Sequence, residues 1–346
     1  MAIRKLNIEF IRIFSVIMVI SIHVANVYIN NFEKVSPEDF LISVIFSSFS
    51  RVCVPLFFMI SGAFIIDKEY DRKKYFEKIL KFIIVLVIWS VIYYLSKNGF
   101  DFKDIGKVIV NSFFNANKTS RHLWYMYPLI AIYIALPFIQ NMCKNMSREL
   151  ENLFLILWFC LSGLTFIFLP LASFITKTDI KMDYPVPIIN SAYYLGYFIG
   201  GHIIYKRVKN LNFSAKNNII CILIYIACSI ITTLATYFIS IKAGYAVSPP
   251  TWYRGSLVIL ASFSVFILLI ANEKKFKNPL IMAVSRHTFG IYLIHMVFLN
   301  IIKWNIDVIS LSPMLTIPLF TLIVYISSLL VCMLLSKIPF VKKIIF

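Results

Sequence analysis

Apolar runs of about 20 residues recur along the whole chain, and a helix of that length crosses roughly 30 Å of hydrocarbon. Most of these runs are apolar on every side, so periodicity does not show which helix face points inward. The pattern predicts an all-α polytopic membrane protein. Its helices, about ten in number, are expected at residues 8–29, 42–66, 76–96, 124–141, 152–170, 188–206, 217–240, 252–271, 279–302 and 312–336.

The loops between these runs are short and no internal repeat is evident, so residues 1–346 are expected to form a single membrane domain. With the N-terminus inside, the cytoplasmic stretches hold roughly twice as many Lys and Arg residues as the outer stretches. The positive-inside rule therefore predicts that both termini are cytoplasmic. No small-residue cleavage site follows the first run, so we expect a retained helix rather than a signal peptide.

Composition excludes a soluble domain, because 60% of the residues are hydrophobic, 14% are charged and the mean hydropathy is +0.82. The net charge of +18 sits in short clusters between apolar runs, which is typical of topology signals and contacts with anionic lipid. We therefore expect a lipid bilayer as partner and no nucleic acid. The six cysteines are scattered without a CxxC pair, and no acid accompanies the histidines at ligand spacing, so no metal site is predicted.

The first run contains two ionisable residues, Arg12 and His23. At 100° and 1.5 Å per residue they project from the same helix face, about 16 Å apart along the axis. Such residues are rare inside membrane helices and usually mark function. The structural alternative is that Arg12 reaches the headgroups and His23 is a satisfied histidine of the bundle. Glu9, one turn before Arg12, is placed to form an ion pair that partly offsets the burial of the arginine.

The second run, 42–66, places Arg51 too deep to reach the headgroups, so it must find an acid, a carbonyl-lined pocket or an anionic ligand. Pro55 is expected to kink this helix, and Ser61 with Gly62 permits close approach of a neighbour or a ligand. After this run, Lys68 to Lys81 form a basic stretch that is either a topology anchor or a site for a polyphosphorylated ligand.

Two stretches near the predicted outer face combine aromatic and basic residues. They hold His122, Trp124, Tyr125, Trp252, Tyr253 and Arg254. Aromatic residues at this depth form interfacial belts, and beside a histidine they also bind sugars. On the run 279–302, Arg286 and His287 lie toward the cytoplasm, while His295 lies at the estimated depth of His23 and Arg51. The polar residues thus form a track across the membrane, which suits either an enzyme or a transporter.

Together these stretches resemble the acyltransferase-3 family of bacterial integral-membrane acyltransferases over essentially the whole chain. The family signature of an arginine, ten residues and a histidine is met by Arg12 and His23, and its FxxSG element by Phe58, Ser61 and Gly62. SRVCVPLFFMISG, HLWYMYPLIAIYIALPFIQ, TWYRG and SRHTFGIYLIH are similar to the branch that includes the O-acetyltransferase of enterobacterial common antigen.

The resemblance implies an O-acyltransferase of the bacterial cytoplasmic membrane. It would move an acyl group, commonly acetyl from acetyl-CoA, to a hydroxyl of a cell-surface glycan or its lipid-linked precursor, with no bound cofactor. His23 would be catalytic and Arg12 essential, with Arg51, His295 and Glu9 in support. We expect the donor on Phe58, Ser61, Gly62, Lys73, Lys74, Lys78 and Arg286, and the acceptor on His122, Trp124, Tyr125, Trp252, Tyr253 and Arg254.

Three departures from the family pattern concern the donor side. Glu9 replaces the usual aspartate, Ile13 replaces a glycine, and the usual arginines before the third helix are lysines here. Lysine neutralises phosphate but loses the bidentate geometry of arginine.

His23 is expected to act either as general base or as a transient acyl carrier, with Arg51 or His295 stabilising the oxyanion. The alternative function is export of a small acylated molecule or glycan along the same track. The acceptor and the oligomeric state stay open.

Overall fold

The computed structural model describes residues 6–98, 102–114, 121–164, 192–211, 213–248, 252–272 and 278–345. All regular secondary structure in these ranges is helical, as predicted. The α-helices are α1 (Leu6–Ile29), α2 (Pro37–Ser50), α3 (Cys53–Ile65), α4 (Arg72–Lys97), α5 (Ile105–Phe114), α7 (Met126–Asn145), α8 (Arg148–Phe159), α10 (Ala192–Val208), α11 (Ala215–Ala243), α12 (Ser256–Ala271), α13 (Pro279–Ser285), α14 (Thr288–Asn305), α15 (Pro313–Leu335) and α16 (Pro339–Ile345). Short turns are η1 (Phe32–Lys34), η2 (Arg121–Tyr125), η3 (Cys160–Leu164) and η6 (Val308–Ser310).

Within the described ranges, six helical stretches are long and apolar enough to cross a membrane: α1, α2 with α3, α4, η2 with α7, α11 and α15. They coincide with six of the predicted spans. A seventh, at 279–302, is the bent pair α13–α14. The predicted span 252–271 is the shorter helix α12, and the predicted spans 152–170 and 188–206 run into residues outside the description. The count of ten and the cytoplasmic termini stay predictions.

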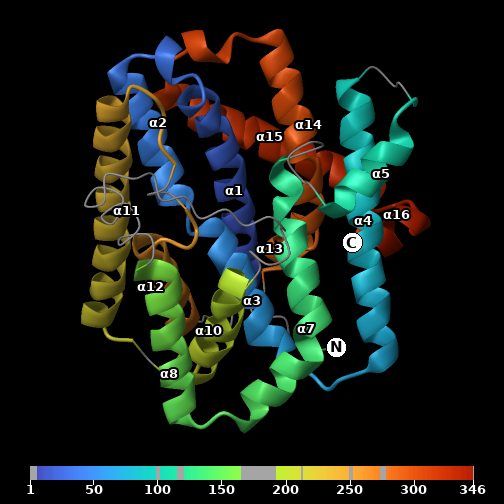
Figure 1. The fold of residues 1–346 in the computed structure, drawn as a ribbon, viewed down its shortest axis with the longest axis vertical. Helices are drawn as coiled ribbons and strands as arrows, with labels where there is room; N and C mark the ends of the chain where they lie inside the picture. Colours follow the sequence, from blue (N-terminus) through green and yellow to red (C-terminus); the bar gives the residue numbers. More distant parts are fainter. Residues whose placement is uncertain are drawn as a thin grey trace.

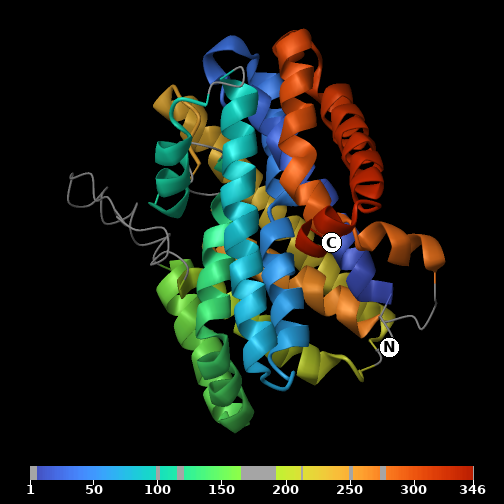
Figure 2. The ribbon, with the colours of Figure 1, turned by 90° about the vertical axis from the view of Figure 1, so that its right-hand side faces the viewer.

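Helix α1 occupies the interior of the bundle, where it packs against α2, α3, α12, α13, α14 and α15 (Figures 1 and 2). By contrast, α11 and α4 lie on opposite flanks (Figure 1). Only 33% of the apolar window of each flanking helix is buried, against 56% for α1. The exposed side chains of α11 are mostly isoleucine, leucine and phenylalanine, which suits contact with lipid. Arg12 and His23, the ionisable residues of the first predicted span, therefore lie on the interior helix of the bundle.

Two predicted spans are broken. Helix α2 ends at Ser50 and α3 begins at Cys53, as the ring of Pro55 removes one backbone hydrogen bond and crowds the carbonyl of Arg51, four residues earlier. This is the effect expected of Pro55. The span predicted at 279–302 is broken as well, because α13 and α14 meet at Arg286–His287 with a bend of 62°.

Side chains that bond to backbone carbonyls hold the helix ends together. Tyr28 Oη, near the end of α1, donates to the carbonyl oxygens of Val308 at 2.9 Å and Leu311 at 3.1 Å. Near the other end of the bundle, Gln140 Nε2 of α7 donates to Ile65 and Lys68, each at 2.9 Å. Buried polar groups with satisfied bonds fix register in an apolar bundle. These contacts hold the walls around α1 in place.

Candidate functional site

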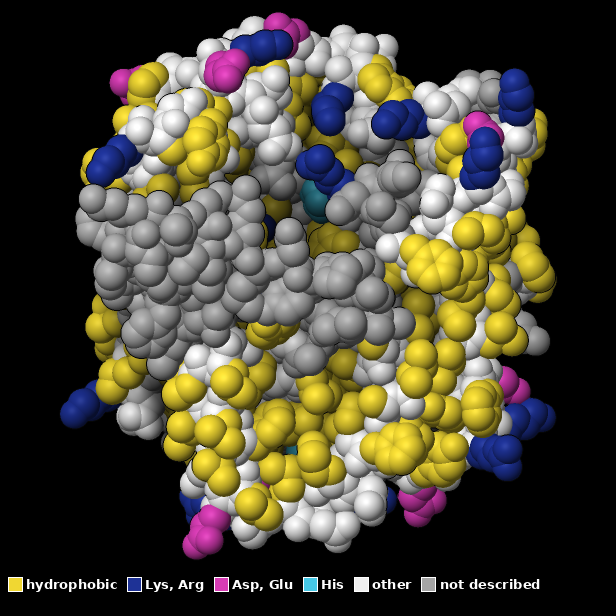
Figure 3. Space-filling model, in the orientation of Figure 1, with side chains coloured by type: hydrophobic (Ala, Val, Ile, Leu, Met, Phe, Trp, Pro, Cys, Tyr) yellow, Lys and Arg dark blue, Asp and Glu magenta, His cyan; other side chains and the backbone are white. Residues whose placement is uncertain are grey.

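A cavity of about 1200 Å³ runs beside α1, which lines it from Arg12 to Ile29. At 1.5 Å per residue this is a length of about 26 Å, close to the thickness of a bilayer core. One end, called the Arg12 end, is lined by Arg12, Lys68 and Lys78. The opposite end, called the Lys303 end, is lined by Lys97, Lys303 and Trp304, where α4 and α14 terminate. Figure 3 shows Lys and Arg side chains around a hollow in the surface, with a histidine inside it.

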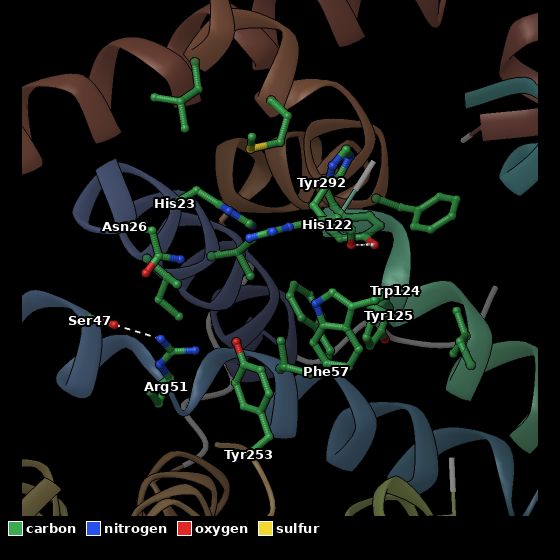
Figure 4. Close-up of a pocket in the computed structure, with 18 of the residues that line it drawn as sticks. His23, Asn26, Ser47, Arg51, Phe57, His122, Trp124, Tyr125, Tyr253 and Tyr292 are labelled. Atoms are coloured by element: carbon green, nitrogen blue, oxygen red, sulfur yellow. Dashed lines mark hydrogen bonds between the residues drawn. The ribbon is translucent and has the colours of Figure 1, made fainter. Parts of the chain in front are cut away.

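Three histidines from distant parts of the sequence meet at the wall of this cavity, His23 and His122 lining it and His295 behind them, and we call them the histidine cluster. His23 of α1 and His295 of α14 have ring centroids 5.2 Å apart, and His122 of η2 lies 5.2 Å from His295 and 6.4 Å from His23. His122 and His295 are buried at 3% and 0% exposure, whereas His23 is partly exposed. Figure 4 shows the rings of His23 and His122 beside each other at the cavity. His23 is therefore the member of the cluster that a substrate reaches first.

His122, predicted near the outer face, lies beside His23 and His295. Helix α7 begins only at Met126, and the preceding turn η2 brings the ring of His122 within 6.4 Å of His23 and 5.2 Å of His295. Two tyrosines hold this turn: Tyr292 Oη donates to the carbonyl oxygen of His122 at 2.6 Å, and the ring of Tyr93 packs edge-on against His122 at 4.7 Å. His122 consequently belongs with the histidines rather than with an outer belt.

His295 has a defined hydrogen-bonding arrangement. Its Nδ1 lies 2.7 Å from the carbonyl oxygen of Tyr292, which can only accept, so in the neutral ring Nδ1 carries the hydrogen. Nε2 then carries the lone pair, and it is buried without a hydrogen-bond partner among the described residues. A neutral His295 can therefore accept a hydrogen bond at Nε2 from a neighbouring group, but it cannot donate one to an oxyanion.

Arg12 forms the ion pair predicted from its spacing with Glu9. Its Nη1 lies 3.0 Å and 3.1 Å from the two carboxylate oxygens of Glu9. The side chain of Glu9 is 3% exposed, while that of Arg12 is 35% exposed and lines the cavity. Glu9 thus lies behind Arg12 and orients its guanidinium group, leaving the other nitrogens directed to the cavity side.

Arg51 lies at the break between α2 and α3 and also lines the cavity. Its Nη2 donates to Ser47 Oγ at 2.9 Å, its guanidinium carbon lies 5.6 Å from the ring centre of Tyr253, and its buried Nε has no hydrogen-bond partner (Figure 4). No described Asp or Glu lies within 4.0 Å of it. The sequence predicted an acid, a carbonyl-lined pocket or an anionic ligand as the partner of Arg51. Among the described residues no such acid is found.

Three aromatic residues, Trp124, Tyr125 and Tyr253, form a continuous surface along the cavity that we call the aromatic wall. Trp124 stacks on Tyr253 with ring centroids 5.5 Å apart and meets Tyr125 edge-on at 6.5 Å. Trp252 also lines the cavity, whereas Arg254 stacks over Trp252 at 4.7 Å and is not among the lining residues. The two stretches expected to bind an acceptor thus meet at one surface.

Of the three residues of the FxxSG element, two pack inside the bundle and one lines the cavity. Phe58 is fully buried between Tyr125 and Tyr194. Gly62 faces α10, and a Cβ built there would lie 1.7 Å from the carbonyl oxygen of Phe198. Only Ser61 lines the cavity, with its hydroxyl donating to the carbonyl of Phe57 at 2.8 Å. Phe58 and Gly62 therefore have packing positions, and Ser61 alone is placed to contact a donor.

The basic residues expected to bind the donor are also separated. Lys78 lines the cavity, with its Nζ 4.9 Å from the ring centre of Tyr133. Lys73 and Lys74 are exposed outside it, and Lys74 forms an ion pair with Asp71 at 2.7 Å. Arg286 is exposed at the α13–α14 break and does not line the cavity. The donor-binding residues that face the cavity thus reduce to Ser61 and Lys78.

Sequence reasoning missed other residues of the cavity wall. They are Asn26, Ser47, Tyr93, Tyr133 and Asn300, with Lys97, Arg121 and Lys303 counted only as loop charges. Asn26, one turn after His23, could have been found from its position on the same helix face. The others lie on helices whose inward faces the apolar pattern does not reveal. Among the described residues, no group of three or more His, Cys, Asp and Glu is arranged to hold a metal ion.

Comparison with known proteins gives one family and one partial relative. Residues 5–337 match the model of the acyltransferase-3 family, described as an acyltransferase domain. Over 130 residues the chain is 30% identical to an amino-acid racemase of Enterococcus faecalis, a match that covers 35% of this chain but only 18% of that protein. No solved structure matches the chain.

Proposed function

This chain belongs to the acyltransferase-3 family of membrane acyltransferases, and we propose that it transfers an acyl group from acyl-CoA to a glycan hydroxyl. Acetyl is the expected acyl group, and a cell-surface glycan or its lipid-linked precursor is the expected acceptor. Sequence stretches similar to the enterobacterial common antigen branch support this choice of acceptor, and the bacterial cytoplasmic membrane is the expected location. The observation that carries the proposal is a cavity with the histidine cluster between its two basic ends.

We propose that the Arg12 end of the cavity faces the cytoplasm and that CoA enters there. Arg12, Lys68 and Lys78 supply positive charge to its phosphates, and Ser61 lies along the route toward His23. The rise of about 16 Å from Arg12 to His23 is comparable to an extended pantetheine arm. The thioester would then reach His23 while the phosphates stay near the cytoplasmic surface.

At the histidine cluster, His23 would remove the proton from the acceptor hydroxyl. The hydroxyl oxygen attacks the thioester carbonyl carbon, the carbon–sulfur bond breaks, and the proton passes to the departing CoA thiolate. The products are an ester and free CoA. A positioned base of this kind contributes about 10²–10⁴-fold to the rate. Only His23 of the cluster is partly exposed to the cavity, which supports this assignment.

His295 would act as a positioning residue for His23. Its Nδ1 is committed to the Tyr292 carbonyl, so Nε2 is the acceptor available to an N–H of the neighbouring His23 ring, 5.2 Å away between centroids. Such a bond selects which nitrogen of His23 carries the hydrogen and leaves the other as the base. This role fits the geometry better than the oxyanion contact expected for His295.

A transient acyl-His23 intermediate remains the alternative chemistry. In that pathway the ring nitrogen of His23 attacks the thioester, CoA leaves, and the acceptor hydroxyl then attacks the acyl-imidazole and frees the histidine. Rapid acid quenching of the protein with labelled acetyl-CoA and no acceptor separates the two pathways. Label retained on the protein supports the covalent pathway, and its absence during turnover supports direct attack.

The test of the proposed function uses purified protein with labelled acetyl-CoA and envelope glycans as acceptor. Wild-type protein and Lys73→Gln, whose residue lies outside the cavity, should both release CoA and label the glycan, while His23→Ala should do neither. Wild-type rates in His23→Ala would contradict the proposal.

A cavity that crosses the bundle also favours transport as the second candidate. Movement of a glycan across vesicles without release of CoA would support that function instead.

A further inference from the structure

All charged side chains that line the cavity among the described residues have the same sign. Seven are basic, namely Arg12, Arg51, Lys68, Lys78, Lys97, Arg121 and Lys303, and none is acidic. Of these, only Arg12 has a described acid within ion-pair distance, Glu9 at 3.0 Å. A cavity lined by one sign of charge concentrates ions of the opposite sign. The lining therefore selects negative ligands along its whole length.

The proposed donor accounts for only part of this charge. Its phosphates would lie with Arg12, Lys68 and Lys78 at the Arg12 end. Arg51 lines the cavity together with His23 and the aromatic wall, and Lys97 and Lys303 line the opposite end. Arg121 precedes His122 of the histidine cluster and is exposed. Four cations thus lie where the acceptor, rather than CoA, would bind.

Arg51 is the strongest of these observations. It lies in the wall of a membrane bundle, bonded only to the neutral Ser47 and facing the ring of Tyr253, with a buried Nε that has no partner. An uncompensated buried charge is strongly unfavourable, so such arginines pair with an acid or with an anionic ligand. No described acid fills that role, and a carboxylate or phosphate in the cavity would fill it with bidentate geometry.

The Lys303 end gives independent support. Lys97 and Lys303 terminate helices on the side expected to face outward, where the positive-inside rule disfavours basic residues. Neither has a described Asp or Glu within 4.0 Å, and the same holds for Arg121. Figure 3 shows such basic side chains around the hollow. Topology does not explain these charges, whereas attraction of an anionic acceptor does.

We propose that the acceptor is an anionic glycan, whose carboxylate or phosphate group binds Arg51 while its sugar ring lies on the aromatic wall. Tyr253 joins these two parts of the site, because it faces Arg51 at 5.6 Å and stacks on Trp124 at 5.5 Å. Lys97, Arg121 and Lys303 attract the charged glycan to the opening. This proposal rests on the proposed acyltransferase function and assigns the chemical class of its acceptor.

Binding without donor tests the proposal separately from catalysis. Protein in nanodiscs of zwitterionic lipid is titrated with N-acetylglucosamine, N-acetylglucosamine 1-phosphate and glucuronic acid, with the fluorescence of Trp124 and Trp252 as the signal. We expect one or both charged sugars to bind about tenfold or more tightly than the neutral sugar, and high salt to reduce the difference. Equal affinity for all three sugars would overturn the proposal.

Arg51→Gln should remove most of this preference, and Arg51→Lys should retain part of it. Lys242→Gln, at the last turn of α11 and outside the cavity lining, is the matched control and should bind as wild type. If Arg51→Gln does not fold, the triple change of the exposed Lys97, Arg121 and Lys303 to Gln must weaken binding of the charged sugar. A preference unchanged in every folded variant would overturn the proposal.

Two further measurements have different purposes. One distinguishes a glycan from a lipid headgroup as the anionic ligand, and the other distinguishes the anionic acceptor from the proposed acyltransferase function. If phosphatidylglycerol in the nanodisc abolishes sugar binding, the cations hold lipid headgroups and the proposal is overturned. Release of CoA with a neutral glycan as acceptor, at a rate equal to that with a charged glycan, would keep the proposed function but overturn the anionic acceptor. Charge-selective binding without any CoA release would keep the anionic ligand but overturn the proposed acyltransferase function.

Discussion

The imidazole rings of His23 and His295 lie with centroids 5.2 Å apart, one on α1 and the other on α14. His295 donates from Nδ1 to the carbonyl of Tyr292 at 2.7 Å, which leaves its Nε2 as an acceptor facing the cluster. The pair therefore joins a residue open to the cavity with a buried one whose hydrogen-bonding direction is fixed. This relationship gives the first prediction.

His295→Ala should lower kcat by about 10–100-fold without changing the KM for acyl-CoA, because His23 loses the group that orients it. The pH profile of kcat should also change shape, which a purely structural effect would not cause. His287→Ala, at the helix break and outside the cavity lining, is the matched control and should retain both values. A wild-type kcat and pH profile in folded His295→Ala would remove the positioning role.

Gly62 gives a prediction that separates packing from donor binding. In Gly62→Ala the new Cβ would meet the backbone oxygen of Phe198 at 1.7 Å, so α3 and α10 must move apart. We expect a lower melting temperature, equivalent to about 1–3 kcal/mol of overpacking. Gly106→Ala is the control, since nothing lies within 4 Å of its Cβ. An unchanged melting temperature with a raised KM for acyl-CoA would instead support the donor role expected from FxxSG.

Lys78 and Lys74 test which lysines bind the donor. Lys78 lines the cavity, whereas Lys74 points away from it and pairs with Asp71 at 2.7 Å. Lys78→Gln should raise the KM for acyl-CoA several-fold, up to about tenfold, which corresponds to about 1.4 kcal/mol. The effect should shrink at high salt. Lys74→Gln should leave the KM unchanged, and an equal rise in both variants would point to a general surface attraction.

The orientation of the cavity can be tested by labelling from each side of sealed vesicles. Of the six native cysteines only Cys160 is exposed, so Cys160→Ser provides the background. In that background, Lys68→Cys should react with a charged thiol reagent from the cytoplasmic side and Lys303→Cys from the outer side. Reaction of both from the same side would contradict a cavity that connects the two faces.

The sequence predicted the helical class, the six long spans and the Arg12–Glu9 pair because each depends on local spacing. The break after Ser50 followed from Pro55 for the same reason. By contrast, no proline marks the 62° bend at Arg286–His287, which depends on contacts with the rest of the bundle. The contact of His122 with His23 did not follow from the sequence, because it depends on how the turn before α7 packs into the bundle.

Much of the candidate site was predictable where an ionisable residue interrupted an apolar run. Arg12, His23, Arg51 and His295 were found in this way, and all except the buried His295 line the cavity directly. Lysines at helix ends gave no such signal, because the same residue type serves topology. Lys303 therefore became part of the site only once the termini of α4 and α14 were seen beside the cavity.

The central claim is that one cavity brings a donor from one face and an acceptor from the other to His23. Proteoliposomes with a single protein orientation test this directly, with labelled acetyl-CoA and a glycan acceptor in separate compartments. We predict that glycan is labelled only when acetyl-CoA is on the side of the Arg12 end, and that His23→Ala abolishes the labelling. Labelling only when both substrates share one compartment, or labelling that persists in His23→Ala, would contradict the account.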